Sequence, residues 1–200
     1  MKTPEFLFSA LIAIFLLACT NDLSDALDEE LIIDVNAKAN NTGNDFVADN
    51  PEAAREISRL RKAVSNIRTI EDAIAAGWNI KLTPYLQNMG YHLGNGAYLD
   101  DGEFYPDKPE ALLMACNEKG DYVVVGAEYI VPKAGAYENN PPEGFTGDAD
   151  EWALTAGTLW TLHAWIKTPN PDGFFNAPNI KIPLTDQCSG IDDYEGLIIP

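Results

Sequence analysis

The chain has 200 residues, 46% of them hydrophobic, and a formal net charge of −18. This hydrophobic content excludes a wholly disordered chain, and the length suits one ordinary domain with its own core. The negative charge argues against nucleic acid as a partner, because the phosphate backbone repels a strongly acidic surface.

The N-terminus carries a short apolar run, Phe6 to Ala18, which follows Lys2 and stops at Cys19. A run of about thirteen residues is too short for a membrane-spanning helix, which needs ~20, but it is typical of a cleavable signal. The closing residues, Leu16-Leu17-Ala18-Cys19, resemble the signal of bacterial lipoproteins, in which the cysteine is lipidated and becomes the first mature residue. An ordinary secretory signal is the alternative interpretation.

The lipoprotein resemblance implies a signal peptide over residues 1–18 and a membrane anchor through lipid, such as palmitate, at Cys19. It places the protein in the cell envelope, at the outer membrane, and leaves open whether it faces the periplasm or the surface. Residues 19–50 hold eight acids and one basic residue, Lys38. Like charges repel and extend such a segment, so we predict an acidic, flexible tether.

A single globular domain is predicted over residues 51–200. Asn50 is a good N-cap and Pro51 suits the first helical position. Apolar residues then recur at steps of three and four, which predicts an amphipathic helix; these are Ile57, Leu60, Val64 and Ile67. A second short helix is predicted between Thr69 and the stop at Gly77.

After Gly77 the chain alternates short β-branched and aromatic runs with Gly, Pro, Asn and Asp, which predicts strands and turns. Strands are expected over 111–116, 122–131 and 158–166. A hairpin is expected from 91–93 to 97–99, around Gly94-Asn95-Gly96. The predicted fold class is α+β, with two N-terminal helices packed on a mostly antiparallel β-sheet.

The candidate site consists of His92, Glu128 and His163. Glu128 lies inside a strand of Val, Tyr and Ile, where an unpaired carboxylate is costly, so it needs a partner. The chain has only two histidines, and both lie in predicted β segments. Two imidazoles and one carboxylate suit one transition metal ion, Zn, Fe or Cu. Asp100 is a further candidate ligand.

These residues allow three functions. The first is a binding module for a metal ion or small ligand, and the second is a metal-dependent or Glu–His acid/base hydrolase. In the third, a structural or interaction lipoprotein, the three residues only hold the core together. The sequence has no nucleophile elbow, phosphate loop or dinucleotide fingerprint. A small ligand or a protein of the envelope is the expected partner.

Three cysteines are present. If Cys19 carries lipid, Cys116 and Cys188 remain, and two thiols in an exported protein are a natural disulfide pair. The alternative is two unpaired cysteines.

Five short blocks occur in an order that resembles an uncharacterised family of bacterial secreted proteins and lipoproteins. They are Met89-Gly-Tyr-His92, Pro109-Glu-Ala-Leu-Leu113, Glu128-Tyr-Ile-Val-Pro132, Leu162-His-Ala-Trp165 and Asn170-Pro-x-Gly-Phe174. The similarity spans about residues 70 to 180 and implies a secreted domain without a known activity. The family pattern includes the positions of His92, Glu128 and His163, which favours their acting together. The chain departs from it at Met114 and at Cys188, which lies later than the closing cysteine of the pattern.

Overall fold

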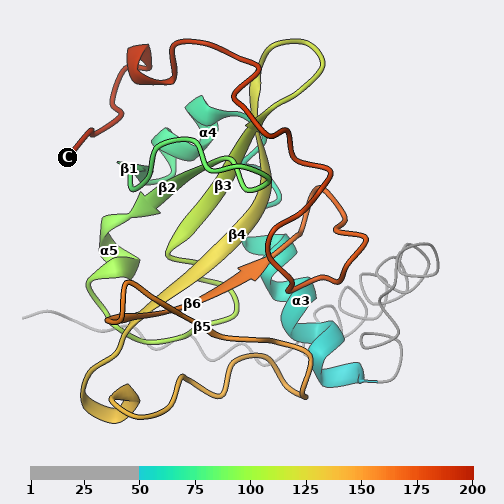
Figure 1. The fold of residues 1–200 in the computed structure, drawn as a ribbon, viewed down its shortest axis with the longest axis vertical. Coiled ribbons are helices and arrows are strands. Elements are labelled where there is room, and N and C mark those ends of the chain that lie inside the picture. Colours follow the sequence, from blue (N-terminus) through green and yellow to red (C-terminus); the bar gives the residue numbers. More distant parts are fainter. Residues whose placement is uncertain (1–49) are drawn as a thin grey trace, which may run out of the picture.

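The computed structural model describes residues 50–200, and the predicted signal peptide, Cys19 and the acidic segment before Asn50 lie outside the described residues (Figure 1). A six-stranded sheet with the order β1-β2-β3-β4-β6-β5 forms the centre, and all its neighbouring strands are antiparallel. The α+β class with an antiparallel sheet is therefore confirmed. The strands are β1 (Trp78–Lys81), β2 (Tyr91–Asn95), β3 (Ala111–Cys116), β4 (Tyr122–Pro132), β5 (Ala153–Thr155) and β6 (Leu159–Ala164).

The described helices are short. They are α3 (Pro51–Ala63), α4 (Ile70–Ala75), α5 (Gly96–Leu99) and the 3-10 turns η1 (Gly135–Tyr137) and η2 (Ile191–Asp193). Within residues 50–200, none of them has the length and apolar character needed to span a membrane. The Asn50 side chain accepts the Ala53 amide at the start of α3, and a Thr69–Asp72 capping box starts α4.

The two faces of the sheet have different neighbours. One face packs with α3 and α4 into the main core, to which β3 contributes Leu112 and β6 contributes Leu162. Leu113 belongs to a second, smaller cluster. Because neighbouring residues of a strand point to opposite faces, the second cluster lies on the other face of the sheet. We call this the site face; its cluster contains Leu113, Ala115, Val125, Trp165 and Ile182.

The predicted hairpin from 91–93 to 97–99 is wrong. Residues 91–95 do form β2, but residues 96–99 form the short helix α5. The Asn95 side chain accepts the Ala97 amide, which caps a helical turn in place of a hairpin turn. The edge of β2 away from β3 pairs with β1, which the sequence analysis did not identify.

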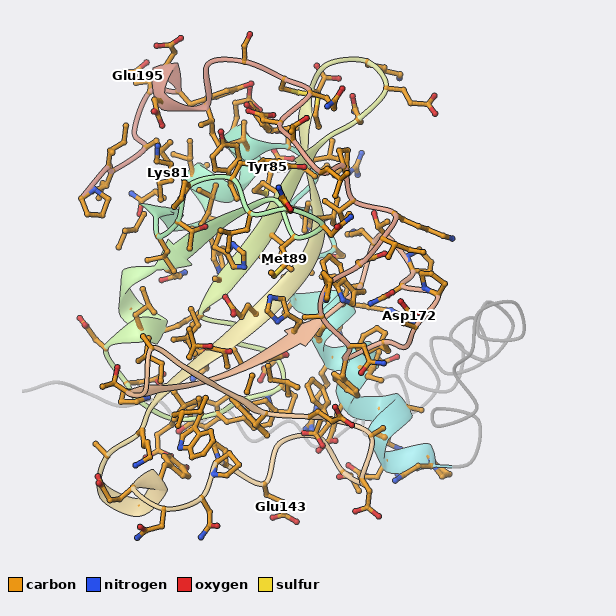
Figure 2. All side chains as sticks on the ribbon, in the orientation of Figure 1. Lys81, Tyr85, Met89, Glu143, Asp172 and Glu195 are labelled. Atoms are coloured by element: carbon orange, nitrogen blue, oxygen red, sulfur yellow. A yellow bond between two sulfur atoms is a disulfide. The ribbon has the colours of Figure 1, made fainter. Side chains whose placement is uncertain are left out.

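Two irregular segments meet over the site face. Asn88, between β1 and β2, donates its side-chain amide to the Ile182 carbonyl at 2.8 Å and accepts the Asn179 amide at its own carbonyl at 3.0 Å. Tyr85 donates its hydroxyl to Pro183 O at 3.0 Å, and Figure 2 labels Tyr85 on this segment. Since Ile182 packs with Leu113 and Trp165, the stretch around it covers the site face.

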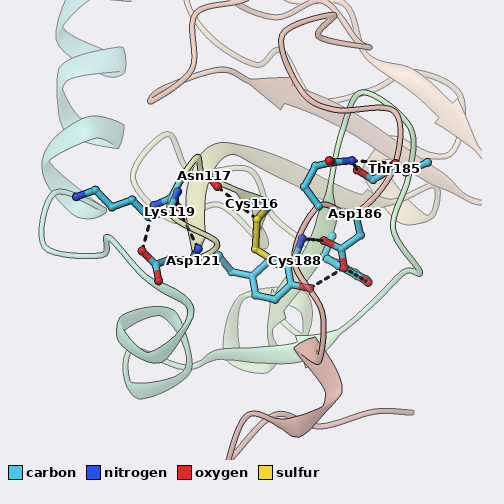
Figure 3. The surroundings of a disulfide bond; sticks show 10 residues. Cys116, Asn117, Lys119, Asp121, Thr185, Asp186 and Cys188 are labelled. Atoms are coloured by element: carbon cyan, nitrogen blue, oxygen red, sulfur yellow. Dashed lines mark hydrogen bonds between the residues drawn. A yellow bond between two sulfur atoms is a disulfide. The ribbon is translucent and has the colours of Figure 1, made fainter.

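A disulfide joins Cys116, at the end of β3, to Cys188 in the C-terminal stretch (Figure 3). Asp186 lies beside it and accepts the Cys188 amide at 3.0 Å. The same carboxylate accepts the hydroxyls of Tyr91 and Tyr122 at 3.0 and 2.6 Å. The covering stretch is therefore tied to the sheet covalently and through hydrogen bonds.

Candidate metal centre

Strand register brings Glu128 and His163 together. Glu128 on β4 lies directly opposite His163 on β6, and on its other side it lies opposite Ala111 on β3. Ala111 in turn lies opposite Gly94 on β2. Directly opposite residues of antiparallel strands point to the same face, so this row lies on one face of the sheet.

His92 reaches the same place from β2. It lies two residues before Gly94, and strand alternation puts both residues on one face. His92 lies directly opposite Leu113 on β3, and the next pair on this face, Gly94 and Ala111, lies in the row of Glu128. The imidazole therefore reaches the carboxylate diagonally, from the neighbouring row.

The three functional groups converge. His92 Nε2 lies 3.5 Å from Glu128 Oε2, and His163 Nε2 lies 3.6 Å from Glu128 Oε1. One ligand atom of each residue lies within 4.8 Å of the others. Within residues 50–200, this is the only group of three or more His, Cys, Asp or Glu side chains placed to hold a metal ion.

The separations between each histidine and Glu128 are longer than direct hydrogen bonds, and the two histidines contact different oxygens of the carboxylate. An N–H···O bond spans about 2.7–3.2 Å, so 3.5 and 3.6 Å are long. A tetrahedral ion at about 2.0–2.2 Å from each ligand holds the ligand atoms roughly 3.3–3.6 Å apart. His163 Nε2 is buried and has no hydrogen-bond partner among the described residues. A buried nitrogen aimed at two other ligand atoms is what a metal site requires.

A hydroxyl and an aromatic ring orient the two imidazoles. Thr83 Oγ1 lies 3.1 Å from His92 Nδ1, on the side of the ring away from Glu128. If Nδ1 donates its hydrogen to this hydroxyl, Nε2 keeps the lone pair that a metal needs. The His163 ring stacks on Trp165 with ring centroids 6.0 Å apart and an interplanar angle of 17°.

Apolar side chains surround the cluster. A β-carbon at Gly94 would lie 2.9 Å from both Leu82 and Leu99, so these side chains already occupy the space over that residue. At Gly126, the corresponding neighbours are Leu113 and Trp165, at 3.0 and 3.1 Å. The His92 and Glu128 residues are only 2% and 7% exposed. The centre therefore lies in a medium of low dielectric constant.

Burial controls the charges of the cluster. It raises the pKa of the Glu128 carboxyl to about 8 and lowers the pKa of His163 to about 4. It lowers the pKa of His92 to about 3, and the neighbouring His163 adds to that effect. In the metal-free protein near neutral pH, the acid is mainly protonated and both imidazoles are neutral. The close Glu–His contacts are thus not ion pairs under these conditions.

Asp100, the further ligand suggested by the sequence, does not join the cluster. It is exposed and forms the C-cap of α5, and it is absent from the metal-binding group of the described residues. Residues 96–99 form α5 in place of the predicted hairpin strand, so Asp100 follows a helix and does not lie on the strand next to His92.

Sequence reasoning missed two residues next to this centre. Thr83 lies in a turn segment, and nothing in its local pattern indicates contact with His92. Glu110 is 1% exposed, and its Oε2 accepts the Ile130 amide of β4 at 3.0 Å. Glu110 lies immediately before β3, and no local pattern indicates that its carboxylate accepts an amide of β4.

Comparisons of the chain with family models, curated proteins and solved structures found no match.

Proposed function

We propose that this protein is a metal-binding module, with one transition metal ion held by His92, Glu128 and His163. The observation that carries the proposal is the convergence of three ligand residues from three different strands in a buried site, with one ligand atom of each within 4.8 Å of the others. The donor set, two imidazole nitrogens and one carboxylate, favours zinc over calcium or magnesium, which prefer oxygen ligands only. Iron and copper remain chemically compatible ions.

The hydrolase alternative has less support without a metal. A histidine whose pKa lies near 4 is a weak general base at neutral pH, and a mainly protonated Glu128 does not strengthen it. The remaining alternative is a structural cluster that holds the core. It predicts that metal ions have no effect on stability.

The test is titration of the metal-free, untagged full-length protein with Zn²⁺, Fe²⁺ and Cu²⁺, followed by elemental analysis and thermal unfolding. We expect one ion per chain and a stabilisation of about 2.7 kcal/mol when free metal is a hundredfold above its Kd. Absence of bound metal together with an unchanged melting temperature for all three ions would overturn the proposal and leave the structural alternative.

Glu110→Gln is the matched control for Glu128→Gln. Both are buried carboxyls, with Glu110 immediately before β3 and Glu128 on β4, but only Glu128 belongs to the cluster. Glu128→Gln should abolish the stabilisation by metal, and Glu110→Gln should retain it. Equal loss in both variants would show that the metal acts elsewhere.

Thr83→Val should weaken metal binding about 10- to 100-fold, because the orienting partner of His92 is lost. Thr83→Ser should restore it. Thr155→Val is the control, since it removes a hydroxyl pair of similar length, 2.9 Å to Thr161, at the edge strand β5.

We also propose that the domain is carried on the bacterial cell envelope by lipid at Cys19. The support is the sequence pattern Leu16-Leu17-Ala18-Cys19 after a short apolar run. Metabolic labelling with a palmitate analogue should mark the native chain and not Cys19→Ala. Equal labelling of both chains would contradict the anchor.

A further inference from the structure

The ligand set fixes the charge of a loaded centre. A metal ion is bound by the lone pair of a neutral imidazole, so His92 and His163 contribute no charge. Glu128 contributes one negative charge. A divalent ion held by these three groups therefore keeps one uncompensated positive charge.

The surroundings do not neutralise that charge. The side chains in contact over the row of strands are apolar, with Leu82 and Leu99 over Gly94 and Leu113 and Trp165 over Gly126. Glu128 adds to the raised pKa of the buried Glu110 carboxyl, but Glu110 Oε2 accepts the Ile130 amide and Glu110 is not part of the ligand group. An uncompensated charge in such surroundings is costly.

The protein supplies three ligands, and a tetrahedral ion takes four. The open position is narrow, because the side chains of His92, Glu128 and His163 are only 3%, 10% and 11% exposed. Glu128 and His163 carry most of this slight exposure, but His163 Nε2 itself is buried, and the Trp165 ring stacks on the imidazole. A fourth ligand must therefore be small.

We infer that the loaded centre binds a small monoanion of a few atoms, such as azide or formate, at this fourth position. The inference rests on the proposed function, because without metal the site carries no positive charge. The anion completes the coordination and neutralises the centre. The side chains around the site, Leu82, Leu99, Leu113 and Trp165, exclude larger anions of the same charge.

The experiment uses the full-length protein loaded with Co²⁺, whose visible absorption reports its ligands. Titration with azide or formate should give a saturable change in the cobalt spectrum. Benzoate, which has the same charge and greater size, should give none. Perchlorate at equal ionic strength controls for screening, and Glu128→Gln controls for cobalt bound elsewhere.

The possible results separate the two proposals. If cobalt binds at the site and stabilises the fold, but no small anion changes its spectrum, this inference is wrong and the metal-binding function stands. A benzoate response equal to that of azide would contradict the size limit. If cobalt and zinc neither bind nor raise the melting temperature, the proposed function itself fails.

Discussion

The two faces of the central sheet are built from neighbouring residues of the same strands, yet they differ in chemistry. On the helix side, Ala127 and Leu162 belong to the main core. One residue further along each strand, Glu128 and His163 face the opposite side. Every second residue therefore serves packing, while the residues between them assemble a polar site.

The difference separates stability from function. Burial of apolar side chains on the helix side favours folding. On the site face, the protein buries a carboxyl and two imidazoles whose pKa values shift because burial penalises their charged forms. Buried titratable groups with shifted pKa values that lie together are characteristic of functional sites. On the site face, burying these three titratable groups costs free energy of folding, and apolar side chains at the same positions would avoid that cost.

The largest effect should follow from cutting the disulfide that ties the C-terminal stretch to β3, beside the main core. The double substitution Cys116→Ala and Cys188→Ala opens a loop with a sequence separation of 72. The chain-entropy model predicts a loss of about 4 kcal/mol of unfolding free energy. Urea denaturation measures the loss, and hydrogen exchange should increase more in residues 176–190 than in α3. Equal increases in both regions would contradict the assignment of the disulfide as a local tie of the C-terminal stretch.

The helix face is tested by Leu112→Ala. Leu112 is fully buried in the main core, and such a truncation costs about 3 kcal/mol, within a range of roughly 2–5. The residual folded protein should still bind one metal ion with unchanged affinity, because the cavity lies on the opposite face. A loss of metal affinity as large as the loss of stability would show that the two faces are not independent.

The site face is tested by Glu128→Gln in the presence of a chelator. Near pH 6 the native carboxyl is mainly protonated, so a neutral amide of similar shape should change the stability by less than about 1 kcal/mol. At pH 9 the native protein holds a buried charge that the variant lacks, and the variant should be the more stable of the two. Urea denaturation at pH 6 and pH 9 measures the free energy of unfolding of both proteins and shows which one is more stable at each pH. A variant that is unfolded at pH 6 would support a structural role instead.

The pH profile of the metal-free protein tests the buried titratable groups together. Glu110 and Glu128 have folded pKa values of about 8 against an ordinary value of 4.5, so their contribution to stability is lost as pH rises from 4.5 to 8. The pKa values of His92 and His163 are lowered from 6.5 to about 3 and 4, so their contribution is lost as pH falls below 6.5. The two trends oppose each other between pH 4.5 and 6.5, where we expect a plateau.

Glu110→Gln should reduce the loss of stability on the alkaline side of that plateau and leave the acid side unchanged. Thermal unfolding at intervals of pH, with a chelator present, measures both sides. An unchanged alkaline slope in the variant would mean that Glu110 is already ionised in the folded protein at lower pH.

The strands that carry the site were largely predictable. Residues 111–116, 122–131 and 158–166 are rich in β-branched and aromatic residues, and they correspond to β3, β4 and β6 with shifts of one or two residues at their ends. Local pattern failed around Gly94-Asn95-Gly96, because the same Gly and Asn residues that start a hairpin also cap a helical turn. The short strands β1 and β5 have weak patterns and exist through pairing with their neighbours.

By itself, the sequence determined the chemical inventory of this protein: a cysteine that ends an apolar run, two histidines, and one carboxylate placed inside an apolar strand. These follow from composition and from the period-two alternation of strands. Only the tertiary structure decided that Glu128 lies opposite His163, that His92 reaches the same carboxylate from the neighbouring row, and that Thr83 contacts its ring. Strand order and register set these contacts, and both depend on packing between distant segments, which no local pattern encodes.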